Sequence, residues 1–165
     1  MMHWYVIHTK PREERRALFN LEQQQFDCYL PLLKVEKIRQ RRLQCVEEPL
    51  FPRYLFIRLD MSDQGQNWAT LRSTKGVSRL VMFGDRPARL EDDWVDGMRA
   101  MERQRQESPE VLFSPGDKVR ITEGPFVGLE GVFHLKDAEQ RVLILVEWLH
   151  KSVKVPLHPA QLVRL

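Results

Sequence analysis

Short apolar runs alternate with amphipathic patterns in the first part of the chain. Residues 4–8 are mostly apolar and have the length of a strand. Residues 11–25 place Ala17, Leu18 and Leu21 on one helical face, and the proline that opens this segment suits the first turn of a helix. The pattern therefore predicts a strand at 4–8 followed by a helix at 11–25.

Three further strands and a second helix follow. We expect a strand at 28–38, interrupted by Pro31, and others at 54–59 and 77–83. Three consecutive acidic residues then open a helix that continues over 91–106, with the polarity that suits the helix dipole.

The remaining pattern is rich in glycine. In residues 115–133, PGDKVRITEGPFVGLEGVF, near-alternating apolar positions and turn glycines predict a small sheet, with a second strand starting at Val132. Residues 143–149 fit strands at period two and an amphipathic helix at period 3.6, because no proline intervenes before Pro156. The order of elements implies two domains joined by a polar linker near 106–110.

Composition narrows the class of protein. The 165 residues carry a net charge of +3, so contacts with nucleic acid must come from local clusters of cations. Cys28 and Cys45 lack metal-ligand spacing, and we expect two buried or partly buried thiols in a reducing compartment. Neither a signal peptide nor a membrane-length apolar run is evident, which favours a soluble, cytoplasmic protein.

Catalysis is not indicated. The five histidines are dispersed, and no nucleophile–base or paired-carboxylate spacing is evident. The glycines between 124 and 131 do not form a phosphate-binding loop, since Pro125 has no amide and no Lys-Ser/Thr follows. We expect a non-enzymatic protein with no cofactor and no metal.

The strand at 54–59 has two different faces. Leu55, Ile57 and Leu59 form a uniformly aliphatic face that suits a core, which leaves Tyr54 and Phe56 on the other face. Either helices cover both faces, or the aromatic face is an exposed patch that docks a partner helix.

Polar clusters supply candidate nucleic-acid contacts. One precedes and enters the first helix, and the other precedes the strand at 77–83; each is either a solvated surface or a site for phosphates and unstacked bases. The basic run at 34–42 indicates a protruding loop or hairpin that contacts DNA non-specifically or keeps its own tip soluble. The two clusters are Lys10, Arg12, Arg16 and Asn20, and Arg72, Ser73, Thr74 and Lys75.

Short motifs are spread over both halves of the chain: Trp4-Tyr5, Glu36-Lys37-Ile38, Glu48-Pro49-Leu50-Phe51-Pro52, Tyr54-Leu55-Phe56, Thr74-Lys75-Gly76-Val77-Ser78, Phe83-Gly84 and Pro115-Gly116-Asp117-Lys118-Val119. Together they resemble the NusG family of transcription elongation factors and, within it, the specialised RfaH-like branch. Housekeeping members share the Phe-Pro-x-Tyr-Leu-Phe core. The resemblance implies an α+β fold: an NGN α/β sandwich with an antiparallel sheet over 1–105, a linker at 106–112, and a KOW domain over 113–165. That second domain is either a small SH3-like β-barrel or an autoinhibitory α-helical hairpin.

The resemblance also implies partners. The residues expected to bind the β′ clamp helices of RNA polymerase, with the β subunit as a further candidate, are Tyr54, Phe56, Trp4 and His8. The two polar clusters are expected to bind the non-template DNA strand, and Lys10, Arg16, Thr74 and Lys75 in them match the family's positions. The residues expected to form contacts between the two domains are Glu48, Arg141, Trp148 and Leu149.

The implied function is transcription elongation and antitermination at selected operons, by a cytoplasmic, nucleoid-associated monomer. The KOW domain would recruit a small-subunit ribosomal protein or a termination factor. Two alternatives stay open. One is a general NusG-type factor with a constitutive barrel; the other is an RNA-binding, ribosome-associated KOW protein, for which a net charge of +1 over residues 111–165 is low.

Overall fold

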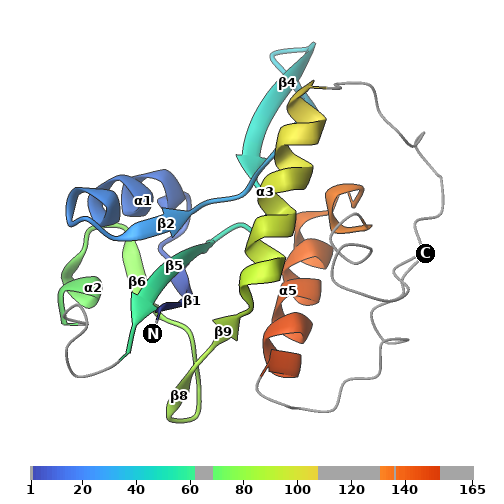
Figure 1. The fold of residues 1–165 in the computed structure, drawn as a ribbon. Coiled ribbons are helices and arrows are strands. Elements are labelled where there is room, and N and C mark those ends of the chain that lie inside the picture. Colours follow the sequence, from blue (N-terminus) through green and yellow to red (C-terminus); the bar gives the residue numbers. More distant parts are fainter. Residues whose placement is uncertain (1, 62–68, 108–130, 136, 153–165) are drawn as a thin grey trace.

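The computed structural model describes residues 2–61, 69–107, 131–135 and 137–152 (Figure 1). Most of the glycine-rich segment, the end of the expected linker and residues 153–165 lie outside these ranges. The elements are β1 (Met2–Thr9), α1 (Glu14–Gln23), β2 (Asp27–Tyr29), β3 (Leu32–Arg39), β4 (Arg42–Pro49), β5 (Tyr54–Asp60), α2 (Ala69–Ser73), β6 (Val77–Leu80), β7 (Met82–Phe83), β8 (Arg86–Pro87), β9 (Arg89–Leu90), α3 (Asp92–Glu107) and α5 (Ala138–Ser152).

A five-stranded antiparallel sheet organises the fold. Its order is β2-β5-β1-β6, and β9 pairs with the part of β1 that precedes the β6 ladder. The longest ladder joins β1 to β5, from Met2 opposite Asp60 to His8 opposite Tyr54. The two apolar runs at 4–8 and 54–59 are therefore the adjacent central strands, as their composition favours.

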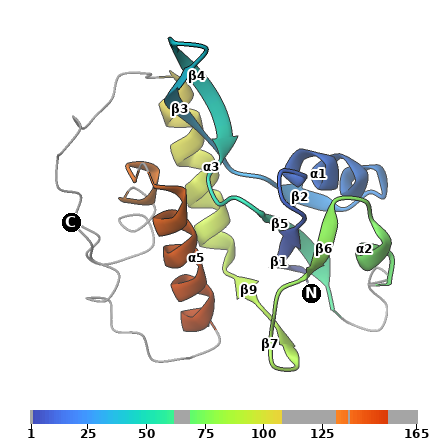
Figure 2. The same ribbon diagram turned by 180° about the vertical axis from the view of Figure 1, so that it is seen from behind.

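Both faces of this sheet are covered. On one face, Leu55, Ile57 and Leu59 join a buried cluster with Ala17 and Leu21 of α1. The other face packs beneath α3 and α5, which lie side by side in both ribbon views (Figures 1 and 2). Burial on both faces explains why β1 and β5 read as continuous apolar runs rather than as alternating strands.

A two-stranded hairpin projects from the sandwich. Strands β3 and β4 pair from Leu32 opposite Pro49 to Arg39 opposite Arg42, with Gln40 and Arg41 at the tip. Both tip residues have positive φ, 52° and 61°, which is the geometry of the tight turn that matches strand twist. The protruding basic hairpin expected at 34–42 is thus formed.

Two sequence expectations about boundaries are corrected. The first helix begins at Glu14 rather than near Pro11, because Arg12 is left-handed with φ of 62° and residues 10–13 form a turn. The strand expected at 77–83 is divided at Val81, whose amide bonds to Val6 and whose carbonyl accepts from Ala88. The short helix α2 was not predicted.

The second strand expected from Val132 is wrong for the described residues, because residues 131–133 are helical. Residues 143–149 also lie in a helix, α5, rather than in strands. The pattern of burial has the helical period. Buried positions recur every three to four residues, at Arg141, Leu145 and Trp148, whereas Leu143 is exposed to solvent.

Gly76 generates a prediction about stability. Its φ is +95°, and a Cβ added there would lie 2.7 Å from the backbone nitrogen of Ala17, so the turn before β6 fits against α1 only with glycine. Gly76→Ala should lower the free energy of unfolding by about 3 kcal/mol, from backbone strain plus the clash.

Gly84 is the matched control for Gly76, because its φ is +65° but nothing lies within 4 Å of an added Cβ. Gly84→Ala should therefore cost only about 1 kcal/mol. Equal losses for the two variants in urea denaturation would contradict the close-approach argument.

Candidate functional site

The aromatic face of β5 is buried beneath α5. Phe56 is fully buried and lies 6.2 Å, ring centre to ring centre, from Phe51. Phe51 in turn lies 6.3 Å from Trp148 of α5, and Trp148 lies 4.3 Å from Trp94 of α3. The two contacts of Phe51 are edge-to-face, a geometry that adds to the stabilisation from burial. Of the two alternatives for this face, the structure shows the covered one, since α3 and α5 pack over Phe56.

The other expected polymerase-binding residues surround Phe56 on the same side. Trp4 is buried in the same cluster, and Tyr54 packs against that cluster while half-exposed. His8 lies beside Tyr54, with ring centres 5.0 Å apart. Burial, followed by the charges of Arg53 and Arg79, lowers the pKa of His8, so its ring is neutral at pH 7. The strand register brings all four residues together.

A buried arginine fixes α5 to the base of the hairpin. Arg141 is fully buried and donates to the carbonyl oxygens of Leu50 and Leu135, each at 2.7 Å. Its second terminal nitrogen donates to Glu48 Oε1 at 3.0 Å. The other carboxylate oxygen of Glu48 accepts from Lys37 Nζ at 2.6 Å. Glu48 thus connects both hairpin strands to α5.

The electrostatics follow from this sharing. Burial by itself would raise the pKa of Glu48, but hydrogen bonds from Lys37 and Arg141 outweigh it and hold the pKa below its ordinary value. Burial lowers the pKa of Arg141, and Glu48 opposes that change. The carboxylate is consequently charged in this state, and it offsets part of the cost of burying the guanidinium.

One polar atom in the contact is left without a partner. The indole nitrogen Nε1 of Trp148 is buried and makes no hydrogen bond within the described part of the chain. A buried N–H without a partner costs about 1–3 kcal/mol relative to its hydrated state. Burying Trp148 beneath the rest of α5 therefore has a free-energy cost from its indole N–H. Release of the helix would remove that cost, because the N–H would then be hydrated.

The two polar clusters are brought together on the opposite side of the sheet. Asn20 Nδ2 of α1 donates to the carbonyl of Lys75 at 3.2 Å, and the amide of Lys10 donates to Gly76 at 2.9 Å. Lys10, Arg12, Arg16, Arg72, Ser73 and Lys75 are exposed, and Asn20 is half-buried. Residues far apart in sequence thus form one cationic surface, called here the α1 surface.

Thr74 does not present its side chain on the α1 surface. It is buried, its hydroxyl donates to Thr70 O at 2.7 Å, and it accepts from Gln24 Nε2 at 2.8 Å. Ser73 is exposed, and its hydroxyl donates to the same carbonyl at 3.1 Å. In this structure Thr74 therefore holds its turn against α1.

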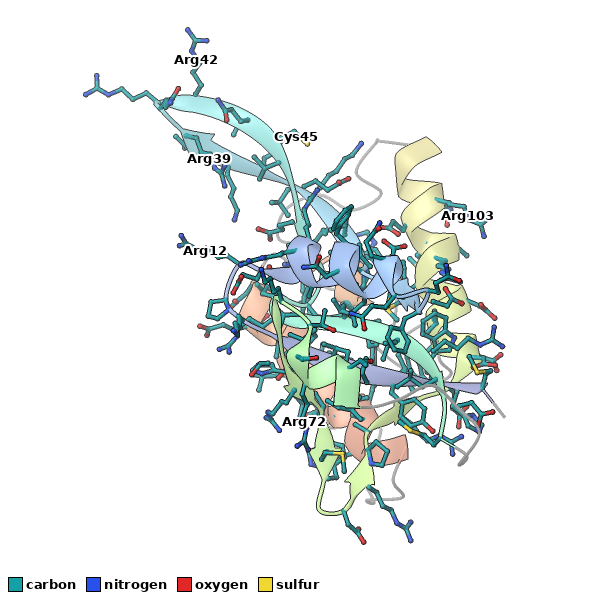
Figure 3. All side chains as sticks on the ribbon, turned by 90° about the vertical axis from the view of Figure 1, so that its left-hand side faces the viewer. Arg12, Arg39, Arg42, Cys45, Arg72 and Arg103 are labelled. Atoms are coloured by element: carbon teal, nitrogen blue, oxygen red, sulfur yellow. The ribbon has the colours of Figure 1, made fainter. Side chains whose placement is uncertain are left out.

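The basic hairpin forms a separate surface. Arg39 and Arg42 occupy its far end, away from Arg12 in the turn that precedes α1 (Figure 3). Ile38 and Leu43 face each other across the strands and are 77% and 68% exposed. Cys45 lies on the same side of the ribbon and is exposed, which corrects the expectation of a buried or partly buried thiol.

Sequence reasoning missed a cluster that holds α3 to the sheet. The guanidinium of Arg99 lies 5.2 Å from the ring centre of Trp4 and 4.9 Å from that of Tyr29. Glu102 accepts from the hydroxyl of Tyr29 at 3.0 Å and from the amide of Leu32 at 2.8 Å. No spacing signal reveals these contacts, because they join residues 70 to 95 positions apart.

Other chemistry is not assembled in the described ranges. There, no three His, Cys, Asp or Glu side chains gather in a way that would hold a metal ion. Within those ranges, too, every helix is either too short or too polar to cross a bilayer.

These elements define an α+β domain in which helices cover an antiparallel sheet. Residues 2–99 match the family described as "NusG: Transcription termination factor nusG". The chain belongs to the NusG family. It is 30% identical to the transcription termination/antitermination protein NusG of Thermus thermophilus, over 98% of this chain and 97% of the relative. It is 29% identical to the protein of that name in Escherichia coli K12, over 96% and 93%. A solved structure, "Domain interaction in Thermotoga maritima NusG", matches with a TM-score of 0.46 at 26% identity, over 76% of this chain and 75% of the other.

The lowered pKa of Glu48 predicts a pH dependence. A carboxyl group whose pKa is lower in the folded than in the unfolded state stabilises the fold above its unfolded pKa, and that contribution is lost as the pH falls through the folded pKa. At pH 7, Glu48→Gln should therefore be less stable than the parent by about 2 kcal/mol, since a charged hydrogen-bond acceptor is lost. The difference between the two proteins should shrink toward zero below about pH 4. A difference that is constant from pH 7 to pH 3.5 in urea denaturation would contradict the ion-pair account.

Proposed function

We propose that this chain is an RfaH-like transcription elongation and antitermination factor that binds RNA polymerase through the face of β5 containing Phe56. Membership of the NusG family supports a role in transcription, since the relatives are transcription termination/antitermination proteins. The specialised assignment rests on one observation: a helix from the C-terminal part of the chain covers that face.

The contact of α5 has the features of a reversible lid. Its inward side is apolar except for Arg141, and Trp148 and Leu149 lie in the same buried cluster as Phe56. The polar contacts at its edge join Glu48 and Arg141 across 93 positions of sequence. A surface that is apolar, aromatic and covered by a helix of the same chain suits later occupation by a helix of another protein.

In this proposal the closed state is inactive. Release of α5 exposes Phe56, Trp4, Tyr54 and His8 to the clamp helices of the polymerase. The domain division is part of the proposal: an NGN domain over 1–105, a linker at 106–112 and a KOW domain over 113–165. The released domain would adopt the barrel favoured by the alternating pattern of the glycine-rich segment, a two-state change of fold.

The α1 surface supplies the second half of the proposal. Its exposed cations contact the phosphates of the non-template strand, and Asn20 is within reach of base edges. Because α1 packs on the sheet face opposite to α5, this surface is accessible in the closed state as well. Selection of particular operons would then depend on DNA, while inhibition would depend on α5.

Detaching α5 should increase binding to polymerase. Leu145→Asp places a charge at a fully buried position of α5, which costs several kcal/mol and favours release. The affinity for core RNA polymerase should rise at least about tenfold, measured by fluorescence anisotropy of a labelled protein.

The control for this variant lies two residues away. Leu143 is on the same helix but is 63% exposed, so Leu143→Asp should leave the affinity unchanged. Release itself is monitored independently by the tryptophan emission of the protein, which should shift to longer wavelength as Trp148 becomes hydrated. If Leu145→Asp releases the helix without any gain in affinity, the lid is not inhibitory and the general NusG-type alternative is favoured.

The polymerase-binding face is better tested at Tyr54 than at Phe56. Phe56 is fully buried, so Phe56→Ala should lower the free energy of unfolding by about 3–5 kcal/mol and confound a binding assay. Tyr54 is half-exposed, and Tyr54→Ala in the Leu145→Asp background should reduce polymerase affinity about tenfold with a smaller loss of stability. Unchanged affinity in that background would place the polymerase elsewhere on the chain.

A further inference from the structure

A large aromatic side chain stands exposed on α1. Phe19 is 61% exposed and belongs to neither hydrophobic cluster. The buried positions of the helix are Glu14, Ala17 and Leu21. At 100° per residue, Phe19 points almost directly away from them, so it occupies the centre of the solvent-facing side. Neither helix packing nor the core accounts for this residue.

Cationic side chains flank Phe19 on both sides. Arg15 and Arg16 precede it by one helical turn and are its neighbours on the surface. Arg15 reaches toward the hairpin, where it donates to the carbonyl of Glu47 at 3.4 Å. On the other flank, Asn20 donates to the carbonyl of Lys75 at 3.2 Å. Phe19 therefore lies between the base of the hairpin and the loop at 72–75.

The surrounding charge is mixed, with cations in excess. Arg16 pairs with Glu13 at 2.6 Å and Arg15 with Glu47 at 3.7 Å, and Glu22 follows Phe19 by one turn. Both arginines stay accessible in these ion pairs, since the side chain of Arg15 is 62% exposed and that of Arg16 is 56% exposed. The exposed cations on the two flanks are Lys10, Arg12, Arg15, Arg16, Arg72 and Lys75.

From this juxtaposition we propose that Phe19 stacks on an unpaired base of a single-stranded nucleic acid whose phosphates contact the flanking cations. An exposed ring within a positively charged surface is how proteins bind single strands, because every base offers an aromatic face. A duplex does not fit, since its bases are stacked on each other and do not present their faces. A protein partner would require a wider apolar patch than one ring bordered by charged side chains.

The inference rests on the proposed nucleic-acid contacts of the α1 surface and gives them a non-electrostatic component. Arginine and lysine contacts to phosphate depend steeply on salt, whereas stacking does not. Phe19 would therefore hold a strand in place when phosphate contacts are screened. It would tolerate any base, so discrimination between sequences would fall to the polar side chains beside it.

Anisotropy of two fluorescein-labelled strands, measured with the intact protein, tests the proposal. One probe is a mixed-sequence 15-nucleotide single-stranded DNA, and the other is an abasic strand of equal length. Phe19→Ser should weaken binding of the base-containing strand about tenfold and leave binding of the abasic strand nearly unchanged. Phe19→Trp should retain affinity. The matched control is Leu143→Ser, an equally exposed apolar residue on α5, which should bind both strands as the parent does.

A parallel variant separates this proposal from the one on which it rests. Arg16→Gln should weaken binding of both strands and reduce the slope of log affinity against log salt by about 0.7, while Phe19→Ser leaves the slope unchanged. If Arg16→Gln weakens binding and Phe19→Ser does not, stacking is wrong and the cationic surface stands. If Phe19→Ser weakens both strands equally, or reduces only polymerase affinity, the ring does not stack on bases. If neither variant changes binding, the nucleic-acid surface itself is wrong and stacking fails with it.

Discussion

The structure depends on a sheet whose two faces are both apolar. Strands β1 and β5 carry large hydrophobic side chains at nearly every position, so neither face is stable in contact with water. On one face, the sheet is covered by α1, which directly follows β1 in the sequence. On the other, α3 covers only part of the surface, and α5 completes it from the far end of the chain. Whatever occupies that second position controls access to Phe56.

The two sides of the sheet are held by different kinds of contact. The α1 side is held by the close approach of Gly76 to Ala17 and by the hydrogen bonds of Thr74, so its cationic surface is preorganised. The α5 side is held by apolar packing and by Arg141, and the N–H of Trp148 has no partner among the described residues. The proposed regulation of polymerase binding requires that another apolar surface can replace this contact.

Prediction from sequence succeeded where short-range pattern decides structure. The apolar runs at 4–8 and 54–59 and the acid-initiated helix α3 were found with nearly correct bounds, whereas the basic hairpin was located but its second strand, β4, was not predicted. It failed where tertiary contacts decide. Helix α1 starts late because Arg12 adopts a left-handed turn, and Thr74 is buried because α1 lies over its loop. The sequence left open whether the face of Phe56 is covered or exposed, because the helix that covers it begins more than 80 positions away.

The sequence by itself determined that residues 54–59 would form a strand with an aromatic and an aliphatic face, and that 143–149 would be amphipathic at either period. Only the tertiary structure decided between those periods. A helix places Arg141, Leu145 and Trp148 on one side, where they are buried and Arg141 pairs with Glu48. A strand would have divided the three side chains between its two faces. Local pattern permitted both conformations with similar ease, and the surface available for burial selected the helix.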